Sequence, residues 1–126
     1  MRQDGRSASL TAPNGQAQQG LLVAALQDAG TTADTLGLSE AHGTGTALGD
    51  PIEAGSLAAV VAAQQRPGDM LVSGGIKANL GHGESTAGVS GLLRLALSLA
   101  SGEEPPNAQL CALNLHVRGA TRGTPS

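Results

Sequence analysis

Apolar residues recur at helical spacing in three segments of this chain, and two short apolar runs separate these segments. Recurrence every three to four residues predicts an amphipathic helix, whereas a short apolar run bounded by turn residues predicts a strand. The pattern predicts helices over 16–29, 51–65 and 85–100, and strands over 36–41 and 70–76. This alternation of helices and strands is typical of an α/β fold.

Two of these helices have recognisable end signals. Gly30 follows the first helical segment and predicts its end. Ahead of the second helix, Asp50 is a candidate N-cap, Pro51 fits the first helical position, and Glu53 completes a capping box. We therefore expect this helix to begin at Asp50 or Pro51, within about two residues. We also expect the Asp50 carboxylate to accept a backbone N–H.

The third helical segment is apolar on almost every side, with Ser90, Arg94 and Ser98 as its exceptions. A helix of this kind is buried on most sides. Two predicted strands cannot surround it, so we expect it to lie in the middle of a larger layered domain. Residues 118–126 contain a single alanine as their apolar content and are expected to form a disordered tail, which leaves 1–117 as the folded part.

Composition and charge narrow the function classes. The 126 residues bound the chain to one small domain or part of a larger one, and its core lacks Phe, Tyr and Trp. A pI of 5.4 without a basic run argues against a nucleic-acid partner. Neither a bilayer-spanning apolar run nor a secretory signal is recognisable, and the lone Cys111 favours a reducing, cytoplasmic compartment.

Two histidines follow the two predicted strands. His42 and His82 each come after a short apolar run and lie beside glycines that permit positive φ, namely Gly43, Gly45 and Gly81. Because parallel α/β sheets build their sites at the carboxyl ends of the strands, we expect the two side chains within roughly 10 Å of each other.

The segments around these histidines resemble a known family. EAHGTGTALGDPIE (40–53) resembles the first-histidine motif of β-ketoacyl synthases of the modular polyketide synthase type, and IKANLGH (76–82), with the following Ala87-Gly88, resembles their second-histidine motif. The flanking segments QDGRS (3–7), TAPN (11–14), PPN (105–107) and LN (113–114) are also similar, so the likeness covers about residues 3–117 and the C-terminal half of a ketosynthase.

The resemblance implies a thiolase-like α/β fold, with a mixed sheet and a buried helix, and a decarboxylative Claisen condensation of acyl and malonyl thioesters. It assigns His42 and His82 to the enolate oxygen, Lys77 to the support of the second histidine, and Thr44 and Thr46 to hydrogen bonds with phosphopantetheine. It implies no bound cofactor other than the phosphopantetheine of an acyl carrier protein. The implied partners are that carrier protein, the N-terminal ketosynthase half or a parent polyketide synthase, and a second ketosynthase copy.

The chain also departs from the family pattern. In the family a cysteine nucleophile precedes the first histidine, whereas Cys111 follows both histidines and lacks the small-residue elbow of an activated nucleophile. We therefore expect Cys111 to be a bystander and the isolated chain to be inactive, apart from conceivable residual decarboxylation. Gly83 and Ser85 stand where the family often has threonine and alanine. His116 has no glycine bend and is interpreted as structural.

Alternative interpretations remain open. The chain could be a non-catalytic half that packs against a complementary ketosynthase chain, and Lys77 could be a solvated surface residue. The glycines at 43, 45 and 49 approach a dinucleotide-binding fingerprint but miss its spacing by one residue. The histidines and nearby carboxylates do not have the spacing of metal ligands, so the sequence predicts no metal site.

Overall fold

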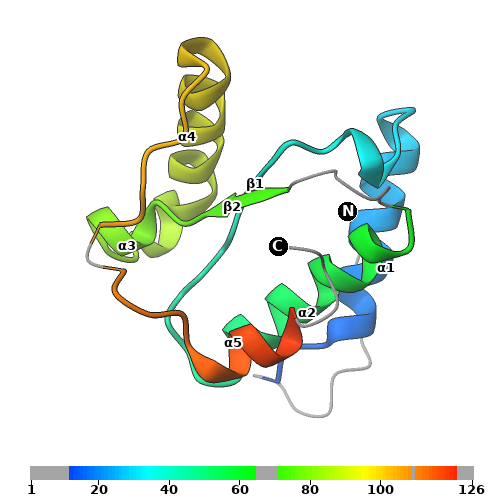
Figure 1. Ribbon diagram of the computed structural model, residues 1–126, viewed down its shortest axis with the longest axis horizontal. Helices are drawn as coiled ribbons and strands as arrows, with labels where there is room; N and C mark the ends of the chain where they lie inside the picture. The colour runs from blue at the N-terminus through cyan, green and yellow to red at the C-terminus, as the bar shows by residue number, and fades with distance from the viewer. Residues whose placement is uncertain (1–11, 65–70, 109, 122–126) are drawn as a thin grey trace.

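A computed structural model of the chain describes residues 12–64, 71–108 and 110–121. Helices, two short strands and two 3₁₀ turns alternate along this part of the chain (Figure 1). In order they are α1 (Gly15–Asp28), η1 (Ala33–Thr35), β1 (Leu38–Glu40), α2 (Gly49–Ala62), β2 (Val72–Gly74), α3 (Lys77–Leu80), η2 (Glu84–Thr86), α4 (Ala87–Ser101) and α5 (Leu115–Ala120).

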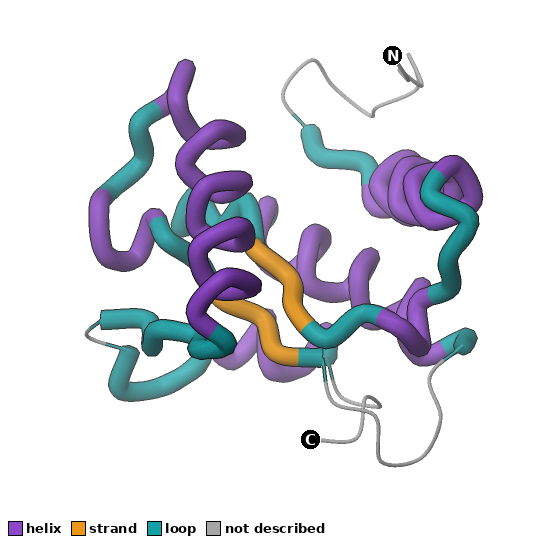
Figure 2. Tube along the Cα trace, turned by 90° about the horizontal axis from the view of Figure 1, so that it is seen from above, coloured by secondary structure: helices purple, strands orange, loops and turns teal. Residues whose placement is uncertain are grey.

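The two strands form a parallel pair, with Leu38 opposite Val72 and Glu40 opposite Gly74. Helix α2 connects the end of β1 to the start of β2, as a parallel pair requires. Helix α4 packs against β1 and crosses the two strands (Figure 2). Both strands therefore end at one edge, where the sequence predicted the histidines.

The apolar core lies between α1, α2 and η1. Ala33, Val60 and Val61 are buried there, and partly buried leucines pack around them: Leu22, Leu26, Leu36, Leu57 and Leu71. Helix α5 packs on α2 as well. Figure 1 shows α1, α2 and α5 grouped on one side of the strands, and α3 and α4 on the other.

The predicted elements are confirmed in type and order, and the predicted strands are too long. The second predicted strand was expected to continue through Ile76. In the structure, the strand ends at Gly74. The reason is that the next two N–H groups pair with side chains: Gly75 donates to Asn107 Oδ1 and Ile76 donates to Glu40 Oε1. Met70 lies outside the described residues.

The N-cap position of helix α2 is Leu48, whose side chain makes no capping hydrogen bond, and Thr46 in the preceding turn, not Asp50, binds the first helical N–H groups. The Thr46 carbonyl accepts the first helical N–H, from Asp50 at 3.3 Å, and its Oγ1 accepts the N–H of Gly49 at 3.1 Å. The start of α2 at Gly49 confirms the predicted boundary, but the predicted Asp50 cap is wrong, because Asp50 lies within the first turn of the helix. Asp50 Oδ1 is instead buried without a hydrogen-bond partner among the described atoms.

Helix α4 buries a narrow face and exposes its apolar one. The buried face consists of Ala87, Gly91, Arg94 and Ser98. Five large apolar side chains on the remaining surface are between 57% and 77% exposed: Val89, Leu92, Leu93, Leu97 and Leu99. The burial expected for this helix is therefore not reached within this chain, and an apolar face of this kind is typical of an interaction surface.

The described part of the expected disordered tail is helical. Residues 118–120 form the end of α5, while 122–126 lie outside the described residues. Asn114 Oδ1 caps α5 by accepting the N–H of His116, and Ala120 of α5 lies next to Gly55 of α2. Among the described helices, none is both long and apolar enough to cross a membrane.

The capping assignment makes a testable prediction. Replacing Thr46 by alanine is expected to lower the free energy of unfolding by about 1 kcal/mol, because the N–H of Gly49 loses its acceptor. Thr46→Ser retains the hydroxyl and should retain most of the stability. Asp50→Ala should not lower the stability, because it removes a buried carboxylate oxygen that has no hydrogen-bond partner among the described atoms. Urea unfolding of the three variants measures these differences, and a larger loss for Asp50→Ala would restore the cap at Asp50.

Candidate active site

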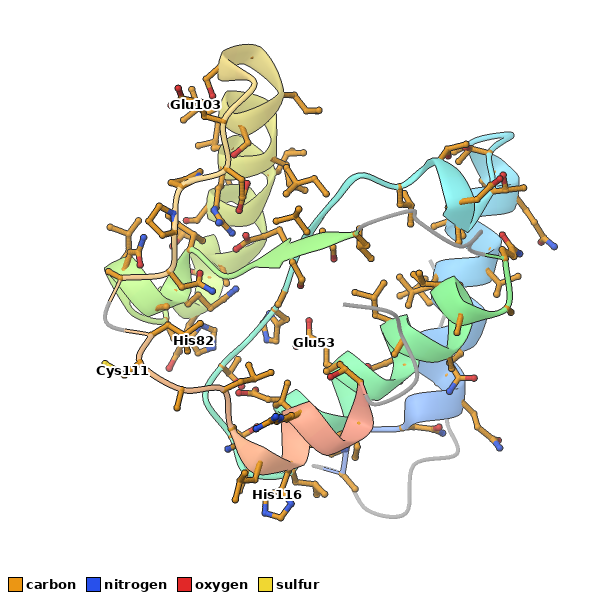
Figure 3. All side chains as sticks on the ribbon, viewed as in Figure 1. Glu53, His82, Glu103, Cys111 and His116 are labelled. Atoms are coloured by element: carbon orange, nitrogen blue, oxygen red, sulfur yellow. The ribbon has the colours of Figure 1, made fainter. Side chains whose placement is uncertain are left out.

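The two predicted histidines meet at the edge where the strands end. The centroids of the His42 and His82 rings are 5.6 Å apart, and the ring planes are nearly perpendicular, at 89°. Both residues are exposed, His42 in the loop after β1 and His82 in the loop after α3, and Figure 3 labels His82. The expected proximity of the two side chains is confirmed.

A carboxylate from α2 holds the backbone of the His42 loop. The N–H groups of His42 and Gly43 donate to the two oxygens of Glu53, the second at 2.9 Å. Glu53 points from α2 toward this loop (Figure 3). The predicted capping box is therefore wrong, because the Glu53 carboxylate binds the His42 loop, while the Asp50 N–H donates to the Thr46 carbonyl.

Glycine conformation allows both loops to turn. Gly43 has φ +46°, and Gly45 and Gly81 both have φ +81°, as the sequence predicted. A side chain at these positions would strain the backbone. Gly83 has a different reason to be glycine, since a Cβ there would overlap Thr86 Oγ1, which donates to the Gly83 carbonyl.

A second carboxylate, which the sequence analysis did not identify as part of the site, links the two histidine segments. Glu40 Oε1 accepts the N–H of Ile76 at 2.7 Å, and Glu40 Oε2 pairs with Arg94. The Glu40 and Arg94 side chains are each 5% exposed. The sequence signal that could have indicated this ion pair was an arginine on a mostly apolar helix, because an arginine is almost never buried unless it is paired.

The PPN segment holds the turn between β2 and α3. Asn107 Oδ1 accepts the N–H of Gly75 at 2.9 Å, and Asn79 Oδ1 accepts the N–H of Ala108 at 2.7 Å. Both contacts lie between residues about 30 positions apart, so the sequence alone could not have predicted them. They fix the segment that leads to His82.

Lys77 and His82 line one cavity of about 320 Å³. The hydroxyl-bearing residues Thr86 and Ser90 line it too. The predicted lysine and the second histidine thus share a recess that a substrate group could enter.

Thr44 and Thr46 lie in the His42 loop. Thr44 is half-buried, and Thr46 uses a lone pair of its hydroxyl to cap α2. A hydroxyl that accepts a hydrogen bond can still donate one. The cap is therefore compatible with the expected contact of Thr46 with phosphopantetheine.

The remaining candidates lie apart from this site. His116 points outward from α5, and Cys111 is exposed on the segment before it (Figure 3). Within residues 12–64, 71–108 and 110–121, no three His, Cys, Asp or Glu side chains are grouped so that they could hold a metal ion.

Sequence comparison identifies the family. Residues 1–111 match the family described as β-ketoacyl synthase, C-terminal domain, and the chain belongs to this family. It is 44% identical over 117 residues to the spectinabilin polyketide synthase system protein NorA' of Streptomyces orinoci, covering 93% of this chain and 3% of that protein. It is 47% identical over 105 residues to the erythronolide synthase EryA3 of Saccharopolyspora erythraea, covering 83% of this chain and 3% of that protein.

Solved ketosynthase structures have the same fold. The oxazolomycin ketosynthase domain OzmH KS7 of Streptomyces albus JA3453 matches with a TM-score of 0.83 at 36% identity, covering 90% of this chain and 20% of that chain. The module 6 ketosynthase of the bacillaene synthase from Bacillus subtilis 168 matches with a TM-score of 0.83 at 30% identity, covering 91% and 21%. The chain thus has the fold of the C-terminal part of a thiolase-like ketosynthase and spans about a fifth of these chains.

The Glu53 contacts predict the effect of an isosteric change. Glu53→Gln leaves one oxygen for two backbone N–H groups, so it is expected to lower the free energy of unfolding by about 1–3 kcal/mol. The amide resonances of His42 and Gly43 should shift in the NMR spectrum. Glu103→Gln, at an exposed position, is the matched control and should be neutral. Equal stability of the two variants would contradict the role assigned to Glu53.

Proposed function

We propose that this chain supplies the two-histidine part of a polyketide synthase ketosynthase, an acyltransferase that performs decarboxylative Claisen condensation. The observation that supports the proposal most directly is the pair of rings 5.6 Å apart at the strand ends. Two imidazoles at this separation can direct N–H groups at a single oxygen atom between them.

The condensation needs such donors. When the bond between the malonyl carbon and its carboxylate breaks, CO₂ leaves and the electron pair moves into the thioester carbonyl. Negative charge develops on that oxygen, and each fixed donor aimed at it is worth about 3–4 kcal/mol in a preorganised site. The enolate carbon then attacks the acyl thioester on a cysteine nucleophile, the new carbon–carbon bond forms, and the cysteine leaves as a thiolate.

Other residues of the site fit supporting roles in this reaction. Lys77, which shares a cavity with His82, places a positive charge near the developing enolate. Thr44 and Thr46 lie in the His42 loop, where their hydroxyls can donate to the phosphopantetheine arm of an acyl carrier protein. This arm is the substrate carrier and would bring the thioester to the two rings.

The proposed nucleophile and the proposed partners lie outside this chain. Cys111 is exposed and does not lie in the histidine loops, so we assign the nucleophile to the part of the ketosynthase that this chain does not include. The apolar face of α4 is the surface proposed to pack against that part, in a ketosynthase that works as a homodimer. A non-catalytic packing half is the second candidate, and the same exposed face favours it.

Complementation tests the proposal. The chain alone, incubated with acyl and malonyl carrier proteins, is expected to form neither an acyl-enzyme nor a condensation product. A chain that supplies the N-terminal part of a ketosynthase should restore condensation. In that complex, His42→Ala or His82→Ala should lower the condensation rate by about 10²–10³, the loss typical of removing an oxyanion donor.

Acyl loading, followed by mass spectrometry, should persist in both histidine variants. His116→Ala, an exposed histidine on α5, is the control and should condense at the wild-type rate. A complex that loads acyl groups but does not condense them would favour the non-catalytic packing half. Acylation of Cys111, lost together with condensation in Cys111→Ser, would show that the chain contains its own nucleophile.

A further inference from the structure

The backbone hydrogen bonds between β1 and β2 end before the two histidines. Past this point, the Glu40 side chain connects the two segments. The last paired residues are Glu40 and Gly74, followed by a bond from the Ala41 N–H to the Gly74 carbonyl at 2.8 Å. Beyond this point Glu40 Oε1 accepts the N–H of Ile76. The carboxylate therefore joins the segment that leads to His42 with the segment that leads to His82.

Both histidines lie a short, constrained distance along the chain from this connection. His42 is two residues after Glu40. Ile76 is the N-cap of α3, and its carbonyl accepts the Leu80 N–H at 3.0 Å, so the short helix is fixed to the same point. His82 follows two residues after the end of α3. A shift of the Glu40 carboxylate relative to Ile76 is thus transmitted to the spacing of the rings.

Arg94 holds the Glu40 carboxylate in place. Its Nη1 pairs with Glu40, while Nη2 pairs with Glu104 and donates to the Pro105 carbonyl at 3.0 Å. The guanidinium lies across Gly74, where a Cβ would overlap both of its terminal nitrogens. On α4 itself, Gly91 brings the helix close to Glu40, since a Cβ there would lie 3.1 Å from Glu40 Cγ.

Among the described residues, the side-chain hydrogen bonds made by Glu53 and Thr86 do not join the two histidine loops. Glu53 binds the backbone of the His42 loop, and Thr86 binds the Gly83 carbonyl after His82. Each of these contacts fixes one loop by itself. The separation between the loops depends on what connects them, which past the end of the ladder is the Glu40 carboxylate.

We propose that the buried Glu40–Arg94 pair sets the separation of the His42 and His82 rings, which makes both residues positioning residues of the two-histidine site. The geometric part of this proposal rests on contacts alone. Its consequence for condensation rests on the proposed function, because donors that must reach one oxygen lose effect when one of them moves. A displacement of 1 Å can lower a rate by about a hundredfold.

The geometric test uses the full 126-residue chain and cross-relaxation between the ring protons of His42 and His82. Arg94→Met removes the guanidinium, and Glu40→Gln leaves one oxygen for two donors. Both are expected to weaken the cross-peak between the rings at least about twofold relative to the wild-type chain, while the resonances of the α1–α2 core persist. Glu104→Gln alters the other partner of the same guanidinium without touching Ile76, and it should retain the cross-peak.

Gly74→Ala keeps both charges and displaces the guanidinium sterically, so it decides the matter if Arg94→Met fails to fold. Its matched control is Gly20→Ala, since a Cβ at Gly20 meets no atom within 4 Å. A cross-peak of wild-type strength in Glu40→Gln and Gly74→Ala would overturn the proposal. An equal loss in Glu104→Gln would overturn it too, because the pair would then have a general structural role.

The kinetic test uses the complex with the N-terminal ketosynthase part. Arg94→Met and Glu40→Gln should lower the condensation rate per acylated enzyme by about tenfold to a hundredfold, with unchanged acyl loading, and Glu104→Gln should lower neither. Parallel losses of loading and condensation would contradict positioning. A wild-type complex without condensation would count against the proposed function and would leave the ring cross-peaks as the measure of the positioning role.

Discussion

The buried guanidinium of Arg94 is the constraint on which the site half of this structure depends. It pairs with Glu40 on β1 and Glu104 after α4, and it donates to the Pro105 carbonyl. Removing one partner of a buried ion pair typically costs about 3–5 kcal/mol, because the other charge stays buried without compensation. The orientation of α4 against β1, and the path of the segment after α4, follow from this pairing.

This constraint also explains why α4 buries small and charged residues and exposes large apolar ones. The face that meets the strands contains Gly91, Arg94 and Ser98, so the helix packs through small and charged residues. Leu92, Leu93, Leu97 and Leu99 consequently lie off this face and are exposed in this chain. The match covers 20% of the OzmH KS7 ketosynthase chain, and a face of this kind is suited to packing against the remainder of such a domain.

The two-histidine site is built by carboxylates that accept backbone N–H groups. Glu53 holds the His42 loop from α2, and Glu40 joins the ends of the two histidine segments. A carboxylate with two oxygens can hold two donors at a fixed separation, which a single helix cap cannot do. The rings themselves remain exposed, so the scaffold fixes the histidine backbones and leaves the imidazoles accessible to a substrate.

The sequence by itself determined the order of the elements, the boundaries of the long helices, the glycines with positive φ, and the proximity of His42 and His82. These features depend on local spacing and on the rule that parallel strands end at one edge. Tertiary structure decided the role of each carboxylate. Glu53 matches a capping box in the sequence but binds a loop ten residues away, and Glu40 meets a guanidinium 54 residues away. The spacing of residues along the sequence cannot predict such distant partners, because the packing of α2 and α4 around the strands brings them together.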